Sequence, residues 1–334
     1  MFSTIDVRPL VASSLCRQSV ALCLGFIGLI GLIGCCGGCQ RKGGATKAPR
    51  QTRSTPSSHE KTIKTVPSLE EIKADLLQAS NIARGMLLYD LTAWHGTDAL
   101  LASDYSGAPF KGFLVTAESA TNADLWMLGA LPDDKLGVVA HVHCDVEASP
   151  EPCTVPPDFA PRPMTADEQT MHRAIETAVS DPFFAPAQEA YNYIVLKGSD
   201  YGVDAGWLVY IVASTTDANV IPVGRHFRFD ISPTGAKVLR RRASHRTIIE
   251  SRRDELPEGV RGEVVAVMSS AVFDAYPTEF QFYVSGLWRV DLSIVGCDGS
   301  LWNVDGLSVE QLQGSAPGAK CPNPWKEANS RKAQ

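Results

Sequence analysis

The sequence predicts an α+β fold: a mostly antiparallel sheet with an N-terminal helix and a second helix near residues 166–179. Apolar residues recur at helical spacing from Leu69, whereas from Tyr191 onward they recur at every second position. The helical and strand patterns occur in separate runs and do not alternate, which is typical of α+β folds. An apolar content of 44% and a charged content of 20% are those of a globular protein.

The first expected element is an amphipathic helix. Ser68 and Glu71 have the spacing of a capping box, which marks a helix start. The apolar residues that follow are spaced by three or four positions and are Leu69, Ile72, Leu76, Ala79, Ala83 and Met86. We expect the helix to bury this row and to extend to about Leu101.

Short strands, a loop and the second helix are expected next. Strand patterns cover residues 113–116, 125–128 and 138–145. The segment from Pro150 to Pro163 is rich in proline and predicts a loop. Thr165 and Glu168 form a second capping box, and the helix that it opens should end before Asp181-Pro182.

The rest of the chain is expected to be rich in strands. Strand patterns cover residues 191–196, 207–213, 226–231, 238–241, 280–284, 287–295 and 301–304, and residues 264–273 fit either a helix or a strand. Turns are predicted at Ser232–Gly235 and at Cys297–Ser300. The polar residues from Gln311 predict a partly ordered end.

The first residues have the parts of an export signal. Arg8 and Arg17 precede an apolar run, Val20–Cys36, that ends in small residues. Within it, Leu32-Ile33-Gly34-Cys35 resembles the lipobox of bacterial lipoproteins. The resemblance implies cleavage after Gly34 and lipidation of Cys35. Because Cys36 and not Asp follows, it also implies an outer-membrane protein facing the periplasm if the cell is Gram-negative.

An uncleaved membrane anchor is the alternative to this leader. The run is at the short limit for spanning a bilayer, and its glycines weaken a helix. The basic residues that follow it favour the alternative, because positive charge flanks the cytoplasmic side of membrane helices. Only the lipoprotein interpretation explains why the run closes on a lipobox.

The chain therefore divides into four predicted parts. Residues 1–34 are a signal peptide, 35–66 a lipidated cysteine with a disordered basic linker, 67–310 a globular body and 311–334 a partly ordered tail; the body could itself divide into parts 67–186 and 187–310. Residues 1–66 hold nine basic and two acidic side chains, and the remainder holds 22 basic and 35 acidic ones. The acidic body argues against binding to nucleic acid.

Four cysteines lie in the body and its tail: Cys144, Cys153, Cys297 and Cys321. An even number in an exported chain predicts two disulfides, and four cysteines allow three pairings. Proximity favours Cys144–Cys153 and Cys297–Cys321. Reduced, buried cysteine is the alternative, and a zinc site of the four is disfavoured because none form a Cys-x-x-Cys pair.

The strongest candidate for chemistry is the segment His141-Val142-His143-Cys144-Asp145. On a strand, alternation places His141, His143 and Asp145 on one face. Two imidazoles and a carboxylate suit a zinc ion that keeps a position open for water. Structural or solvated histidines are the alternative.

A second candidate is a row of basic residues that could hold an anion or an acidic partner. Phe227, Phe229 and Ile231 should face the core, and His226, Arg228 and Asp230 the other side. The residues that could bind an anion are Arg225, His226, Arg228, Arg240, Arg241 and Arg242. A solvated ladder of cross-strand ion pairs is the more common explanation of the row on residues 226–230. A solvated edge strand explains the arginines at 240–242 as easily.

The sequence favours a non-catalytic binding module anchored to the envelope by lipid. It contains no nucleophile-elbow, zincin or phosphate-loop motif, so catalytic residues are unknown. The alternatives are a metal-dependent hydrolase using His141 and His143, and an immunity or inhibitor lipoprotein. We expect the membrane and an unknown protein or envelope component as partners, and no cofactor unless zinc binds.

Overall fold

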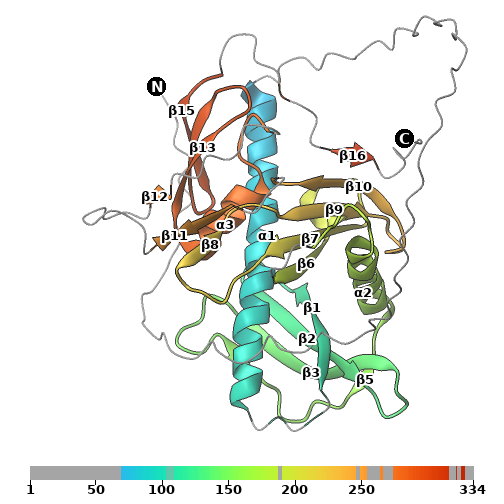
Figure 1. Ribbon diagram of the computed structural model, residues 1–334. Helices are drawn as coiled ribbons and strands as arrows, with labels where there is room; N and C mark the ends of the chain where they lie inside the picture. The colour runs from blue at the N-terminus through green and yellow to red at the C-terminus, as the bar shows by residue number, and fades with distance from the viewer. Residues whose placement is uncertain are drawn as a thin grey trace, which may run out of the picture. The chain divides into compact units, whose positions relative to one another are not determined.

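The computed structural model describes residues 69–327 apart from 104, 106, 108, 187–189, 246–248, 254–263, 266–273, 316–320 and 322–324. It has the predicted α+β fold, with helices α1 (Leu69–Ala102), α2 (Ala166–Val179) and α3 (Glu279–Trp288) against mostly antiparallel sheets (Figure 1). The predicted leader, Cys35 and the linker lie outside the described residues. None of the described helices is both long and apolar enough to cross a membrane.

The first sheet is antiparallel, and its first four strands form a meander. Its strands are β1 (Phe110–Ala117), β2 (Asn122–Ala130), β3 (Leu136–Asp145), β4 (Cys153–Thr154) and β5 (Arg162–Pro163), with β4 and β5 both pairing with β3. The three predicted strands lie within β1, β2 and β3. One face packs on α1 so closely that a Cβ atom on Gly96 would lie 2.7 Å from Leu125 Cδ2.

The second sheet has the strand order β16-β10-β9-β7-β6. The strands are β6 (Tyr191–Lys197), β7 (Trp207–Ala213), β9 (Phe227–Ile231), β10 (Val238–Ala243) and β16 (Lys326–Glu327). A 3-10 turn, η1 (Gly198–Tyr201), follows β6, and a small ribbon pairs β8 (Val220–Pro222) with β11 (Glu250–Arg252). The predicted turn between β9 and β10 is present, with Gly235 at φ 73°.

Helix α2 begins as the sequence predicts. Thr165 accepts the Glu168 backbone N–H at 3.2 Å, and the Glu168 side chain accepts the Thr165 N–H at 2.7 Å, which completes the capping box. The helix buries Met171, Ala174 and Ala178 against the second sheet.

The third sheet corrects the prediction for residues 280–295. Its strands are β12 (Val264–Val265), β13 (Asp291–Val295), β14 (Leu301–Asp305) and β15 (Ser308–Gln313). Residues 280–284, predicted as a strand, belong to α3, and the next strand begins at Asp291 and not at residue 287. The alternating aromatic and β-branched residues favour a strand locally, but as a helix they bury Phe280, Phe282 and Tyr283 together.

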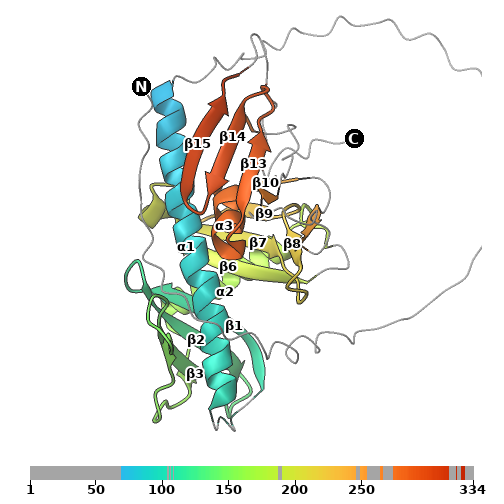
Figure 2. The ribbon, with the colours of Figure 1, turned by 90° about the vertical axis from the view of Figure 1, so that its left-hand side faces the viewer.

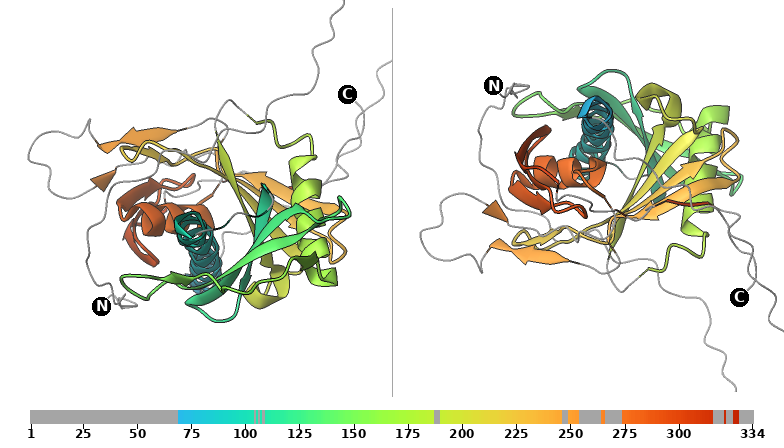
Figure 3. Two further views of the ribbon diagram at one scale, coloured as in Figure 1. Left: turned by 90° about the horizontal axis from the view of Figure 1, so that it is seen from below. Right: turned by 90° about the horizontal axis from the view of Figure 1, so that it is seen from above.

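Helix α1 connects the sheets (Figures 2 and 3). The predicted row is buried from Leu76 to Met86 and half-buried at Ile72, whereas Ser68 lies outside the described residues. Ser80 Oγ donates to the Leu307 carbonyl at 2.9 Å, near the third sheet. Asp90 accepts from Asn192 of β6 at 3.1 Å and from the Tyr283 hydroxyl of α3 at 2.9 Å.

The four body cysteines form the two local disulfides, Cys144–Cys153 and Cys297–Cys321. The first joins residues that are direct register partners on β3 and β4. The second ties Cys321 to the turn between β13 and β14.

Alkylation of the denatured, non-reduced protein is therefore expected to modify none of these four cysteines, because a thiol joined in a disulfide does not react. The modified residues are identified by peptide mass spectrometry. Reduction before alkylation serves as the control and should expose all four. Full modification without reductant would show that the cysteines are reduced in the native protein.

Candidate functional site

The predicted histidines lie on the face of the first sheet that points away from α1. The antiparallel register pairs Asp124 of β2 with His143 of β3, and Trp126 with His141. Leu125 and Val142 on the opposite face are fully buried. The strand alternation thus gathers polar side chains on one face beside the turn between β1 and β2.

We call Glu118, Asp124, His141 and His143 the histidine cluster. One oxygen, Asp124 Oδ1, lies 2.8 Å from His141 Nε2 and 3.0 Å from His143 Nδ1. Ligand atoms of Glu118, Asp124 and His143 all lie within 4.8 Å of one another. The Asp124 side chain is 12% exposed and that of His143 is 43% exposed, so the cluster is open to solvent on the His143 side.

The two imidazoles keep Asp124 ionised. Burial raises the pKa of the Asp124 carboxyl group, but the hydrogen bonds from His141 and His143 lower it by more, and the net direction is downward. An ionised carboxylate flanked by imidazoles is a good ligand for a divalent cation.

His141 is held in place by aromatic packing. Its ring stacks on Trp126 with the ring centroids 4.1 Å apart, and Phe159 lies 5.9 Å away on a tilted contact. Trp126 Nε1 donates to Thr116 Oγ1 at 2.8 Å, and the Arg162 guanidinium lies 4.8 Å from the Trp126 ring. The orientation of His141 toward Asp124 is therefore fixed by its neighbours, whereas His143 faces solvent.

The predicted ligand Asp145 is not part of the histidine cluster. Asp145 Oδ1 accepts the backbone N–H of Glu147 at 3.2 Å, which closes the turn after β3. Its place is taken by Asp124 and Glu118, neither of which the sequence singled out. No local signal marks them, because they come near the histidines only through the pairing of β2 with β3 and the turn after β1.

Two arginines of the predicted basic row, Arg228 and Arg242, are buried inside the protein, whereas the Arg240 side chain is 37% exposed. Arg228 donates to Asp230 at 2.8 Å and to Glu279 of α3 at 3.0 Å, and Arg242 donates to Glu279 at 2.6 Å. Arg240 donates to Asp230 at 2.6 Å. We call these five residues the arginine network; Asp230 is fully buried and the Glu279 side chain is 4% exposed.

The arginine network corrects the prediction of a solvent-facing row. His226, Arg228 and Asp230 do share one face, as predicted, but α3 covers that face. The guanidinium groups of Arg228 and Arg242 already have carboxylate partners. The ring of Trp325 also lies 4.8–5.0 Å from the guanidiniums of Arg228, Arg240 and Arg242.

The other three residues of the predicted anion site each have a partner of their own within the protein. Arg241 points to the opposite face and pairs with Asp181 at 2.6 Å, and Arg225 donates to the Ala185 carbonyl. His226 accepts the Ala213 N–H at 3.1 Å, and burial lowers its pKa to about 3. The six residues therefore do not come together as an open anion site.

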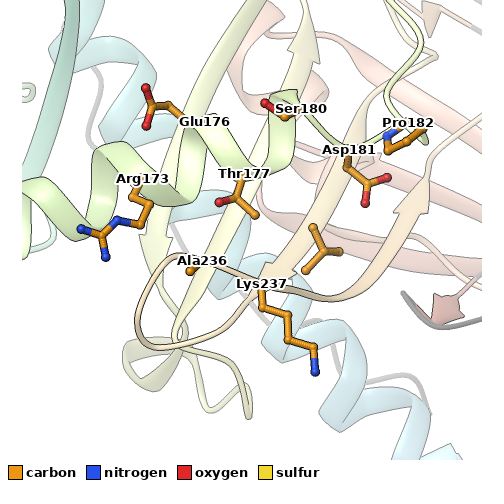
Figure 4. Close-up of a pocket in the computed structure, with 9 residues that line it drawn as sticks. Arg173, Glu176, Thr177, Ser180, Asp181, Pro182, Ala236 and Lys237 are labelled. Carbon is orange, nitrogen blue, oxygen red and sulfur yellow. The ribbon is translucent and has the colours of Figure 1, made fainter.

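A groove of about 560 Å³ lies between α2 and the turn that joins β9 to β10 (Figure 4). Its walls carry both signs of charge, from Arg173, Glu176 and Lys237. Several lining groups are already engaged: Thr177 Oγ1 donates to the Gly235 carbonyl at 2.7 Å, and Arg173 donates to the Thr234 carbonyl at 3.3 Å. The histidine cluster is the more specific site, because its donors converge on one point.

Comparison with known proteins identifies no relative of this chain. No protein-family model, curated protein or solved structure matches the chain. Its function is therefore inferred from its own residues.

Proposed function

We propose that this chain is a lipid-anchored protein of the bacterial cell envelope, and that its folded body is a non-catalytic binding module facing the periplasm. The lipobox Leu32-Ile33-Gly34-Cys35 carries the proposal. In a Gram-negative cell the anchor would lie in the outer membrane, because Cys36 follows the lipidated cysteine. Acyl chains on Cys35 would supply the two signals that stable membrane anchoring requires.

The two disulfides support an exported body. Disulfides persist in oxidising compartments such as the periplasm and are rare in the bacterial cytosol. Cys144–Cys153 joins two strands of the first sheet, and Cys297–Cys321 involves the turn between β13 and β14 of the third sheet.

The net charge of the body indicates what kind of partner it would bind. From residue 67 onward the chain has 22 basic and 35 acidic side chains, so a partner with a basic surface would be attracted. The arginines that the sequence offered for an acidic partner are largely matched by Asp230, Glu279 and Asp181. A protein or envelope component with positive charge is therefore the favoured ligand, and nucleic acid is disfavoured.

The substitution Cys35→Ser is expected to abolish incorporation of a palmitate analogue and to leave an unprocessed precursor, because serine lacks the thiol that forms the thioether. Labelling is read by gel fluorescence and processing by mass. Cys36→Ser and Cys39→Ser are matched controls in the same segment and should keep both. A Cys35→Ser protein that is still processed and still partitions with membranes would refute the anchoring proposal.

A further inference from the structure

We propose that Glu118, Asp124 and His143 bind a divalent transition-metal ion of the zinc class, with His141 holding the Asp124 carboxylate in position. The site is independent of the lipid anchor and would add a metal to the proposed binding module. Its ligands differ from those expected from the sequence, because Asp145 is not among them. Two other carboxylates take its place: Asp124 on β2 and Glu118 in the turn before β2.

The donor atoms are close to the spacing that a bound ion requires. Zinc takes imidazole nitrogen and carboxylate oxygen at about 2.0–2.2 Å, so two tetrahedral ligands lie roughly 3.3–3.6 Å apart. His143 Nδ1 and Asp124 Oδ1 are 3.0 Å apart, and the Glu118 carboxylate lies within 4.8 Å of both. Because Glu118 is exposed, its side chain can rotate to close the third bond.

The charges of the cluster favour a cation. The carboxylate oxygens of Glu118 and Asp124 lie within 4.8 Å of each other. In the part of the chain that the structure describes, no lysine or arginine forms an ion pair with either group. Two neighbouring carboxylates repel each other, and a divalent ion bound between them removes that repulsion.

His141 would act as a positioning residue and not as a ligand. Its Nε2 lies 2.8 Å from Asp124 Oδ1, and its ring is packed against Trp126 and Phe159. Metal-ligating carboxylates are themselves held by hydrogen bonds, and loss of such a bond typically weakens metal affinity 10–100-fold. The 18% exposure of His141, against 43% for His143, fits a supporting role on the protein side of the site.

The site is tested by calorimetric titration of the chelator-treated full chain in detergent with zinc chloride. One high-affinity ion is expected per wild-type chain. Asp124→Asn and His143→Gln are expected to reduce the affinity by at least about tenfold, because each removes a direct ligand. His141→Ala should weaken binding by about tenfold without abolishing it, since the three ligands remain.

A matched control and a spectroscopic readout separate this site from others on the chain. His172 pairs with Glu176 on α2 at 3.6 Å, outside the cluster, and His172→Gln should bind zinc like the wild type. Bound Co²⁺ should show d–d absorption without thiolate charge transfer, and should quench the fluorescence of Trp126, which stacks on His141. Near-ultraviolet circular dichroism confirms that each variant is folded.

Three results would overturn the proposal. The first is no zinc uptake by the folded wild-type chain. The second is unchanged stoichiometry and affinity in folded Asp124→Asn and His143→Gln. The third is a Co²⁺ spectrum with thiolate charge transfer, which would place the ion on cysteines.

Discussion

Glu279→Gln is expected to lower the free energy of unfolding by about 3–5 kcal/mol, because it removes the buried counter-charge that two guanidinium groups share. Glu279 accepts from Arg228 at 3.0 Å and from Arg242 at 2.6 Å, and both arginine side chains are less than 10% exposed. Glutamine keeps the size of the side chain, so the change isolates the charge. The effect is measured by urea unfolding followed by circular dichroism, with the disulfides intact.

The control for this substitution is Glu310→Gln on β15, where the side chain is exposed. It should change the free energy of unfolding by less than about 0.5 kcal/mol, as expected for a surface position. A loss below about 1 kcal/mol in Glu279→Gln would show that the buried arginines find other compensation, and the arginine network would then not be a main source of stability.

The lowered pKa of Glu279 predicts how the stability of the fold depends on pH. Burial raises the pKa of Glu279, but Arg242 and Arg228 lower it by more, to about 2 from its ordinary value of 4.5. The folded-state pKa is thus depressed, so the stabilisation is fully present above about pH 4.5 and is lost as the pH falls toward 2. Between these values the wild type should lose stability more steeply than Glu279→Gln.

Elements with strong local signals could be predicted from the sequence. The capping box of Thr165 and Glu168 locates the start of α2, and the spacing from Leu76 to Met86 locates the buried side of α1. Strand β7 matches the predicted range because its apolar run is bounded by turn residues. In each of these elements, propensity, periodicity and boundary signals agree.

Helix α3 could not be predicted from its apolar pattern. Its aromatic and β-branched residues favour a strand, and the correct signal is the spacing of Thr278 and Gln281. In the structure the Gln281 side chain accepts the Thr278 backbone N–H at 2.9 Å, which is half of a capping box. The capping residues therefore predict a helix, whereas the composition of the segment that follows them predicts a strand.

The burial of β9 and the composition of the histidine cluster depend on long-range contacts. The Arg228 guanidinium is covered by residues far away in the sequence, among them Glu279, 51 positions later, and Trp325. Asp124 reaches His141 and His143 through the register of β2 with β3, which no short motif encodes. Sequence reasoning therefore identified the two histidines but not their partner.

Deletion of residues 1–65 is expected to leave the folded body nearly unchanged. Residues 40–66 have no apolar row to bury, and the described residues begin at Leu69. A chain starting at Val66, produced with its disulfides formed, should unfold cooperatively. Its free energy of unfolding should lie within about 0.5 kcal/mol of that of a chain starting at Gln40.

Deletion through Met86 is expected to have the opposite effect, because it removes the half of α1 that packs against the third sheet and η1. The buried side chains lost include Leu76, Ile82 and Met86, and the hydrogen bond from Ser80 to Leu307 is lost with them. At about 1.5–3 kcal/mol for each large apolar side chain, the three together contribute roughly 5–9 kcal/mol. That is comparable to the total stability of a typical domain, about 5–15 kcal/mol.

The shortened chain should therefore show no cooperative thermal transition by calorimetry or circular dichroism. The chain starting at Val66 is the matched control, since it differs only in keeping residues 66–86. If the chain that begins after Met86 melts like this control, the first half of α1 does not support the core. The structural boundary of the body would then lie within the helix, and the burial of Met86 would reflect contacts that stability does not require.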